Sequence, residues 1–204
     1  RGFYESEGIS SLKNSVEDVF SAISFLRSDE MIRKYRIDAD NIALAGWSYG
    51  GDIALTAAAS DSSIKYVISI AAADLSDIAR LAEKNEEFRA MFIETMNDRH
   101  SNGPVKGPGG EKQLKELLEN SDKYDLVKHA KNLSDRSLLI IGGWKDQAST
   151  LEGHVLPFIR ALQSQEAEKV EMVILDANHA FEGKRDELAT VFIKWLTDNH
   201  PGKD

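Results

Sequence analysis

Cysteine does not occur in the 204-residue sequence, and proline occurs only four times. Without cysteine the chain has no disulfide, no thiol nucleophile and no thiolate metal site. No apolar run approaches the roughly 20 residues that a membrane-spanning helix needs, and no secretory signal peptide is recognisable. These absences predict a cytoplasmic protein with no membrane partner.

The charge balance is acidic. Lysine and arginine number 25 against 34 aspartate and glutamate residues, which gives a formal net charge of −9. Such a surface repels phosphate backbones, so nucleic acid is excluded as a partner. A hydrophobic fraction of 42% with 29% charged residues is typical of a soluble globular protein. The length suits one domain over residues 1–204.

The most informative stretch is an apolar run that ends in a glycine-rich turn. Residues 42–45 are apolar, Gly46, Ser48 and Gly50 form a Gly-x-Ser-x-Gly pattern, and a small-residue helical pattern follows at 53–59. In this strand–turn–helix setting the pattern is typical of a nucleophile elbow, where a strained serine is exposed above a sheet. We expect side chains at positions 46 and 50 to crowd the turn. The alternative is a glycine-rich turn with a passive serine.

Four apolar runs, at residues 42–45, 66–71, 137–143 and 170–175, alternate with helical patterns. Helices are expected from about residue 14, with Ser15 and Asp18 as a capping box, over 151–164 and at the C-terminal end, while charged residues 33–36 mark a connection. Continuously apolar strands between helices predict an α/β protein with a parallel sheet covered on both faces.

The segment from about residue 74 to 132 departs from this alternation. Charged amphipathic stretches at 75–98 and 111–119 flank a loop, 101–110, that contains four glycines and two prolines. No strand pattern occurs in the segment. It therefore predicts a helical cap insertion over an active site. For residues 101–110 alone there is an alternative to a cap: the segment would be an ordinary crossover helix between two strands, and these residues would be a disordered loop in it.

Suitable catalytic partners for Ser48 follow two later strands. A serine hydroxyl needs a base within hydrogen-bond reach, and the base needs an orienting carboxylate. Ligands bind at the carboxyl ends of strands in an open parallel sheet, and Asp146 and His179 follow the runs 137–143 and 170–175. We expect Ser48 as nucleophile, Asp146 as acid and His179 as base. Asp74, just past the run 66–71, is the alternative acid.

The other candidates are less well placed. His100 lies in the insertion, His200 in the tail, and His129 and His154 on or beside helices; Asp176 lies at a strand end and would shape its loop. No two histidines have helical ligand spacing beside a carboxylate, so no metal is expected. Residues 107–112 lack the preceding strand and the following hydroxyl residue of a phosphate loop, so no cofactor is expected.

An oxyanion hole needs two backbone N–H donors. Tyr49, directly after Ser48, is expected to supply one. The other normally comes from a loop after an earlier strand, and no strand is predicted before residue 41. The chain also opens at Arg1 without methionine. We therefore expect the missing segment to precede Arg1, or a partner to supply the second donor.

Three motifs together resemble the α/β-hydrolases: Gly-Trp-Ser-Tyr-Gly-Gly at 46–51, Gly-Trp-Lys-Asp at 143–146 and Asn-His-Ala-Phe at 178–181. The nearest resemblance is to the prolyl-oligopeptidase and dipeptidyl-peptidase-like branch and to related bacterial esterases. The opening Arg1-Gly2-Phe3 resembles the sequence after that family's fourth strand, so the resemblance covers the whole chain. It departs at residues 148–150, Ala-Ser-Thr, where the family often has apolar residues and a proline.

This resemblance implies an α/β-hydrolase fold whose N-terminal strands are missing, with Ser48, Asp146 and His179 in the family's order. The strand before Ser48 would then have an open edge, which would allow a homodimer. The expected activity is that of a serine hydrolase cleaving carboxylic esters or related acyl bonds of a small-molecule or short-peptide substrate, through an acyl-enzyme and without a cofactor. A serine peptidase of the prolyl-oligopeptidase type is one alternative. A non-catalytic or truncated scaffold is the other.

Overall fold

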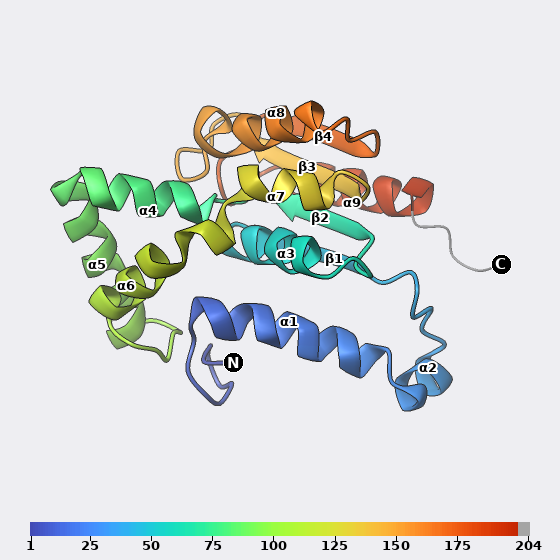
Figure 1. The fold of residues 1–204 in the computed structure, drawn as a ribbon, viewed down its shortest axis with the longest axis horizontal. Helices are drawn as coiled ribbons and strands as arrows, with labels where there is room; N and C mark the ends of the chain where they lie inside the picture. The colour runs from blue at the N-terminus through green and yellow to red at the C-terminus, as the bar shows by residue number, and fades with distance from the viewer. Residues whose placement is uncertain (200–204) are drawn as a thin grey trace.

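A four-stranded parallel sheet forms the centre of the structure. The computed structural model describes residues 1–199. Across the sheet, in chain order, lie β1 (Ala43–Trp47), β2 (Tyr66–Ile70), β3 (Ser137–Gly143) and β4 (Val170–Leu175) (Figure 1). Each neighbouring pair is parallel, so all four carboxyl ends lie along one side of the sheet. The predicted parallel sheet is confirmed, with β1 and β4 as its outer strands.

Helices cover the two faces of the sheet unequally. One face packs against α1 (Leu12–Leu26), α3 (Tyr49–Ser60), α7 (Leu126–Leu133) and α8 (Leu156–Ser164). The opposite face packs against α9 (Arg185–Asn199). Side chains alternate along a strand, so Val67 and Leu138 face the first group while Ile68 and Leu139 face Trp195 of α9. On the α9 face, β1 is only partly covered, and its residues Ala45 and Trp47 are exposed.

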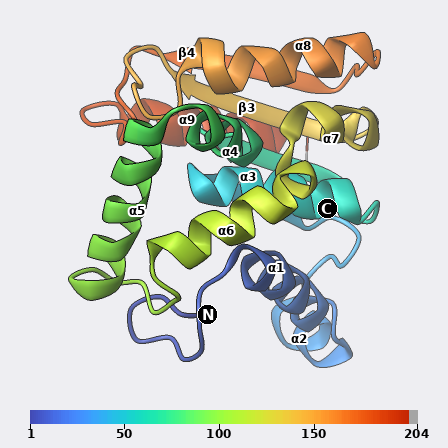
Figure 2. The same cartoon turned by 60° about the vertical axis from the view of Figure 1, so that its left-hand side comes forward.

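The segment between β2 and α7 is helical. It contains α4 (Leu75–Lys84), α5 (Glu86–Ser101), α6 (Gly110–Asn120) and a short 3₁₀ turn, η1 (Ser121–Tyr124). The stretch predicted as one helix over 75–98 is two, because Asn85 has an extended backbone that ends α4, and its side chain accepts the N–H of Phe88 to begin α5. From the far end of α5 the chain returns along α6, which packs against both α4 and α5 (Figure 2).

The loop at the tip of this insertion is joined to the first residues of the chain. Phe3 and Val105 form an antiparallel bridge. Three main-chain hydrogen bonds surround it: Tyr4 N to Pro104 O, Lys106 N to Gly2 O and Ser10 N to Lys106 O, each 2.7 Å long. The loop predicted over 101–110 spans 102–109 in the structure, and the segment that precedes α1 holds it in place.

A second connection ties α6 to α1. The carboxylate of Glu116 accepts the N–H groups of Leu12 and Lys13, at 3.2 Å and 3.1 Å. The first N–H groups of a helix have no partner within the helix. A carboxylate placed there accepts them, and its negative charge also interacts favourably with the positive end of the helix dipole. A side chain of the insertion thus completes the start of a helix that packs on α3.

Two local predictions were wrong, and a third was right in extent. The N-cap of α1 is Ser11, whose backbone is extended at φ −153° and whose hydroxyl accepts the N–H of Asn14, so Ser15 and Asp18 form no capping box. Residues 33–36 are not merely a connection, because α2 (Asp29–Tyr35) begins at the cap Ser28. The helix expected over 151–164 is confirmed, although its first part is a π-helical turn, η2 (Leu151–Val155), that continues into α8.

Within residues 1–199, every helix is too short or too polar to traverse a lipid bilayer.

Candidate active site

Ser48 occupies the sharp turn between β1 and α3. Its backbone, with φ 55° and ψ −121°, lies in a region that residues other than glycine rarely adopt. Its N–H donates to the carbonyl of Ile70 on β2 at 2.8 Å, and its carbonyl accepts the N–H of Gly51 at 2.9 Å. Hydrogen bonds on both sides therefore hold the strained residue in place.

Two glycines make this turn possible, and they are Gly46 and Gly51. A Cβ atom at Gly46 would lie 2.0 Å from the carbonyl oxygen of Gly50, and one at Gly51 would lie 2.9 Å from Cβ of Ala72. A Cβ at Gly50 would meet nothing within 4 Å. The expectation for position 46 is confirmed, whereas the one for position 50 was wrong because that residue faces open space.

Ser48, His179 and Asp146 form a continuous hydrogen-bonded chain. Nε2 of His179 lies 2.9 Å from Oγ of Ser48, and Nδ1 lies 2.8 Å from Oδ2 of Asp146. The side chain of Asp146 is fully buried, whereas that of His179 is 27% exposed. The structure thus brings together the three side chains nominated from the sequence, at the distances that a serine, its base and an orienting acid require.

The loop after β3 fixes the carboxylate of Asp146. Its second oxygen, Oδ1, accepts the N–H groups of Ala148 and Ser149, each at 2.8 Å. The same loop is joined to the loop after β4, because the N–H of Lys145 donates to the carbonyl of Ala177 at 2.9 Å. These bonds leave Oδ2 of Asp146 directed at the imidazole.

Of the two candidate acids, Asp146 is the one that contacts His179. Asp74 is the N-cap of α4, where its carboxylate accepts the N–H groups of Ser76 and Asp77. Its own N–H donates to Nδ1 of His154 at 3.2 Å. Asp176 is exposed and pairs with Lys145 at 2.7 Å.

The remaining histidines have other partners. Ring nitrogens of His100 and His129 lie 3.3 Å and 2.8 Å from the carbonyls of Val105 and Lys123. His154, whose pKa is lowered mainly by burial, contacts the main chain at Asp74. His200 lies outside the described residues. Among residues 1–199, no group of three or more metal-ligating side chains could hold a metal ion.

The family model of the prolyl oligopeptidases matches residues 7–199. The chain belongs to the prolyl oligopeptidase family. The chain is 34% identical over 102 residues to a curated relative from Escherichia coli. This relative is the uncharacterized 31.7 kDa protein of the traX-finO intergenic region. That match covers 48% of this chain and 33% of the relative, so the chain spans about a third of that protein.

Solved structures show the fold of this family member. An acylaminoacyl peptidase of Pyrococcus horikoshii superposes with a TM-score of 0.64 at 17% identity, over 95% of this chain and 29% of that one. Est1E from Butyrivibrio proteoclasticus superposes with a TM-score of 0.65 at 17% identity, over 93% of this chain and 71% of Est1E. A monoacylglycerol lipase of Paleococcus ferrophilus superposes with a TM-score of 0.61 at 16% identity, over 95% of this chain and 77% of the lipase. The predicted α/β-hydrolase fold is confirmed, and the neighbours include peptidases, esterases and a lipase.

Tyr49 connects the elbow of this prolyl-oligopeptidase relative to α1. As the first residue of α3, its N–H has no carbonyl partner within the helix. Its phenol donates to Oγ of Ser15 at 2.8 Å, and burial raises the pKa of that phenol. The side chain thus fixes the backbone beside Ser48. The role of the Tyr49 N–H as an oxyanion donor stays a prediction.

A buried carboxyl group, missed from the sequence, lies in the first turn of the same helix. Asp52 has no exposed surface. Its two oxygens accept the N–H of Leu75 at 3.1 Å and the hydroxyl of Thr56 at 3.2 Å, which connects α3 to the start of the insertion. Burial raises the pKa of Asp52 well above its usual value, and the nearby Asp74 raises it further. A lone acid in an otherwise small and apolar helical run was the available signal.

Replacing Asp52 with asparagine should make the protein more stable at pH 8 than the wild type. A carboxyl whose pKa is raised by folding stabilises most below its unfolded pKa of about 3.9, and that contribution falls as pH rises towards the folded pKa. Asparagine keeps an oxygen for Leu75 and never ionises. The melting temperatures of Asp52→Asn and the wild type should nearly agree at pH 4. By pH 8 the variant should melt higher, by about 2–4 °C for each kcal/mol by which its free energy of unfolding exceeds that of the wild type.

The control for this experiment is Asp122→Asn. The pKa of Asp122, which is exposed, is lowered by the hydrogen bond from Lys128, so this variant should gain no stability between pH 4 and pH 8. A difference between Asp52→Asn and wild type that stays the same across this range would show that Asp52 does not titrate as described.

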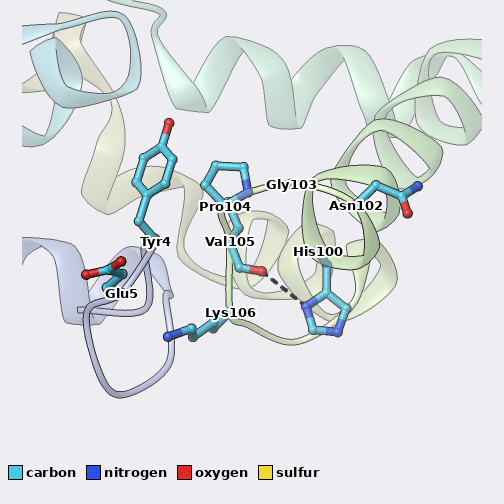
Figure 3. A pocket seen from close by; sticks show the side chains of 8 residues that line it. All are labelled: Tyr4, Glu5, His100, Asn102, Gly103, Pro104, Val105 and Lys106. Atoms are coloured by element: carbon cyan, nitrogen blue, oxygen red, sulfur yellow. Dashed lines mark hydrogen bonds between the residues drawn. The ribbon is translucent and has the colours of Figure 1, made fainter.

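A cavity of about 530 Å³ opens between the start of the chain and the tip of the insertion. Figure 3 shows its eight lining residues: Tyr4, Glu5, His100, Asn102, Gly103, Pro104, Val105 and Lys106. Ser48, Asp146 and His179 are not among them. This cavity is therefore separate from the hydrogen-bonded chain at the sheet edge.

Proposed function

We propose that this protein is a serine hydrolase that cleaves carboxylic esters or related acyl bonds. The observation that carries the proposal is the chain of contacts from Oγ of Ser48 through His179 to Asp146, at 2.9 Å and 2.8 Å. A serine hydroxyl is a weak nucleophile at neutral pH unless a base in this position takes its proton. Membership of the prolyl oligopeptidase family supports the same chemistry.

The reaction would follow from these contacts. As Oγ of Ser48 bonds to the acyl carbon, Nε2 of His179 takes its proton, and Asp146 stabilises the imidazolium through Nδ1–H. The carbonyl oxygen gains negative charge beside the N-terminal end of α3, where the N–H of Tyr49 would donate to it. His179 then gives its proton to the departing alkoxide or amine. Water repeats the sequence on the acyl-enzyme and releases the acid.

The surroundings of Ser48 supply the remaining parts of the proposal. Residues 1–204 would form one domain, in which the helical segment 74–132 lines the acyl or leaving-group pocket. β1 is an outer strand of the described sheet, and pairing of its free edge with a second copy of the chain would produce a homodimer. The ligand would be a small acyl compound or a short peptide.

A serine peptidase is the second candidate function. It is favoured by the family match and by the likeness to an acylaminoacyl peptidase. The likeness to a monoacylglycerol lipase and to an esterase of Pyrococcus furiosus favours esters instead. Both reactions use the same three side chains, so the substrate decides between them.

The experiment compares p-nitrophenyl acetate and butyrate with aminoacyl and prolyl p-nitroanilides at equal enzyme concentration. We expect ester turnover well above the buffer rate and little cleavage of the anilides. Comparable kcat/KM for a prolyl anilide would replace the esterase by the peptidase. Hydrolysis of neither class would favour the non-catalytic scaffold and contradict the proposed function.

A further inference from the structure

The histidine of the proposed reaction reaches Ser48 from the far side of the sheet. His179 lies in the loop after β4, whereas Ser48 follows β1, and these are the two outer strands. Neighbouring strands lie about 4.8 Å apart, so the two strand ends are separated by roughly 14 Å. The loop must therefore pass over the ends of β3 and β2, and its position at β1 needs a contact of its own.

Most contacts of this loop do not fix it at β1. Asn178 and Glu182 bond to each other, and the N–H of Phe181 donates to the carbonyl of Asn178, which sets the shape of the loop. The bond from Lys145 to Ala177 fixes its beginning at β3. None of these contacts involves β1.

Trp47 makes the contact at β1. It is the last residue of that strand and directly precedes Ser48. Its indole Nε1–H donates to the main-chain carbonyl of His179 at 3.0 Å. The indole and imidazole rings lie with centroids 5.2 Å apart and planes inclined by 38°. The carbonyl and the ring of one histidine are thus contacted by a single side chain.

The exposure of Trp47 separates this role from ordinary core packing. Its surface is 51% exposed, on the face where β1 is only partly covered. A tryptophan that served only to fill the core would be buried, with the hydrophobic effect holding it there. Here the ring lies against the loop of His179, and its one polar atom is bonded to that loop.

We propose that Trp47 is a positioning residue for His179. Because it is bonded covalently to Ser48, it places the main chain of the base relative to the nucleophile across the width of the sheet. Its ring also lies within the roughly 6 Å at which an aromatic face attracts a cation, so it favours the imidazolium that forms when the base takes the proton. This inference rests on the proposed hydrolase function.

The test uses Trp47→Phe, which keeps a ring without the N–H, and Trp47→Leu, which removes both. Loss of one neutral hydrogen bond should lower kcat for p-nitrophenyl butyrate by about 3- to 10-fold in Trp47→Phe. Trp47→Leu should lower it by roughly 10- to 50-fold, because the contact with the imidazolium is also lost. In both variants the melting temperature should stay close to wild type, since Trp47 lies outside the buried core. KM should also change little, because the contact acts on the base.

Trp144→Phe is the matched control. Trp144 also lies at the carboxyl end of a strand, directly after β3, and is 68% exposed, but its indole donates no hydrogen bond within residues 1–199. It should keep wild-type kcat. An unchanged kcat in Trp47→Leu, a fall in kcat that accompanies lower stability, or an effect confined to KM would overturn the positioning role. An inactive wild-type protein would instead overturn the hydrolase function on which this inference rests.

Discussion

A Ser48→Ala variant is expected to hydrolyse p-nitrophenyl esters about 10⁶-fold more slowly than the wild-type protein, the order of loss found when a serine-protease nucleophile is removed. Alanine has no atom that can form the acyl-enzyme, and His179 is left without a hydroxyl to deprotonate. Residual turnover would come from water attacking a substrate that is still bound and polarised. Steady-state assays at a much higher enzyme concentration than the wild type requires would measure this residual turnover.

A fluorophosphonate probe provides the matching covalent readout. It should label wild-type protein at one site and leave Ser48→Ala unlabelled. Ser60→Ala is the control, because Ser60 is an exposed serine at the other end of the same helix. Equal labelling of wild type and Ser48→Ala would show that another residue reacts, and would remove Ser48 from the mechanism.

An Asp146→Asn variant is expected to lose about 10⁴-fold in kcat, with KM little changed, as in serine proteases that carry the same substitution. The asparagine oxygen can still accept the N–H groups of Ala148 and Ser149. Its amide would then face Nδ1 of His179 and donate to it. The imidazole would carry its proton on Nε2, facing Ser48, where it cannot act as a base.

The control for Asp146→Asn is Asp176→Asn. Asp176 directly follows β4 and pairs with Lys145 at the surface, away from His179. An exposed ion pair contributes little, so Asp176→Asn should keep a kcat close to that of the wild type. Retention of wild-type activity in Asp146→Asn, or equal losses in the two variants, would contradict the role of Asp146. Circular dichroism of each variant would establish that the fold is intact.

The parts of this structure that could be predicted are those with a local cause. Continuous apolar runs specify buried parallel strands, and a catalytic side chain that directly follows such a strand comes to the sheet edge whatever the intervening helices do. Ser48, Asp146 and His179 could therefore be nominated without coordinates. Gly46 could be too, because the crowding involves residues four and five positions along the chain.

The parts that could not be predicted depend on contacts between distant segments. Trp47 lies 132 residues along the chain from His179, whose carbonyl it bonds. The hydrophobic pattern of the sequence reveals helices and strands but not a contact between two such distant residues. Asp52 in sequence is only an acid in a helix; its burial arises because the start of α4 covers it. The break at Asn85 was missed because charged residues continue on both sides of it, while its extended backbone is a local departure that a charge pattern does not reveal.

The anchoring of the helical insertion has a kinetic consequence. A lid that opens needs a free tip and a hinge, yet this segment is bonded at its start by Asp52, at its tip by the first ten residues and along α6 by Glu116. Swinging it outward would break main-chain hydrogen bonds at several places together. Progress curves should accordingly be linear from the first turnover, without a lag and without activation at an oil–water interface, because no outward movement of this segment has to precede turnover.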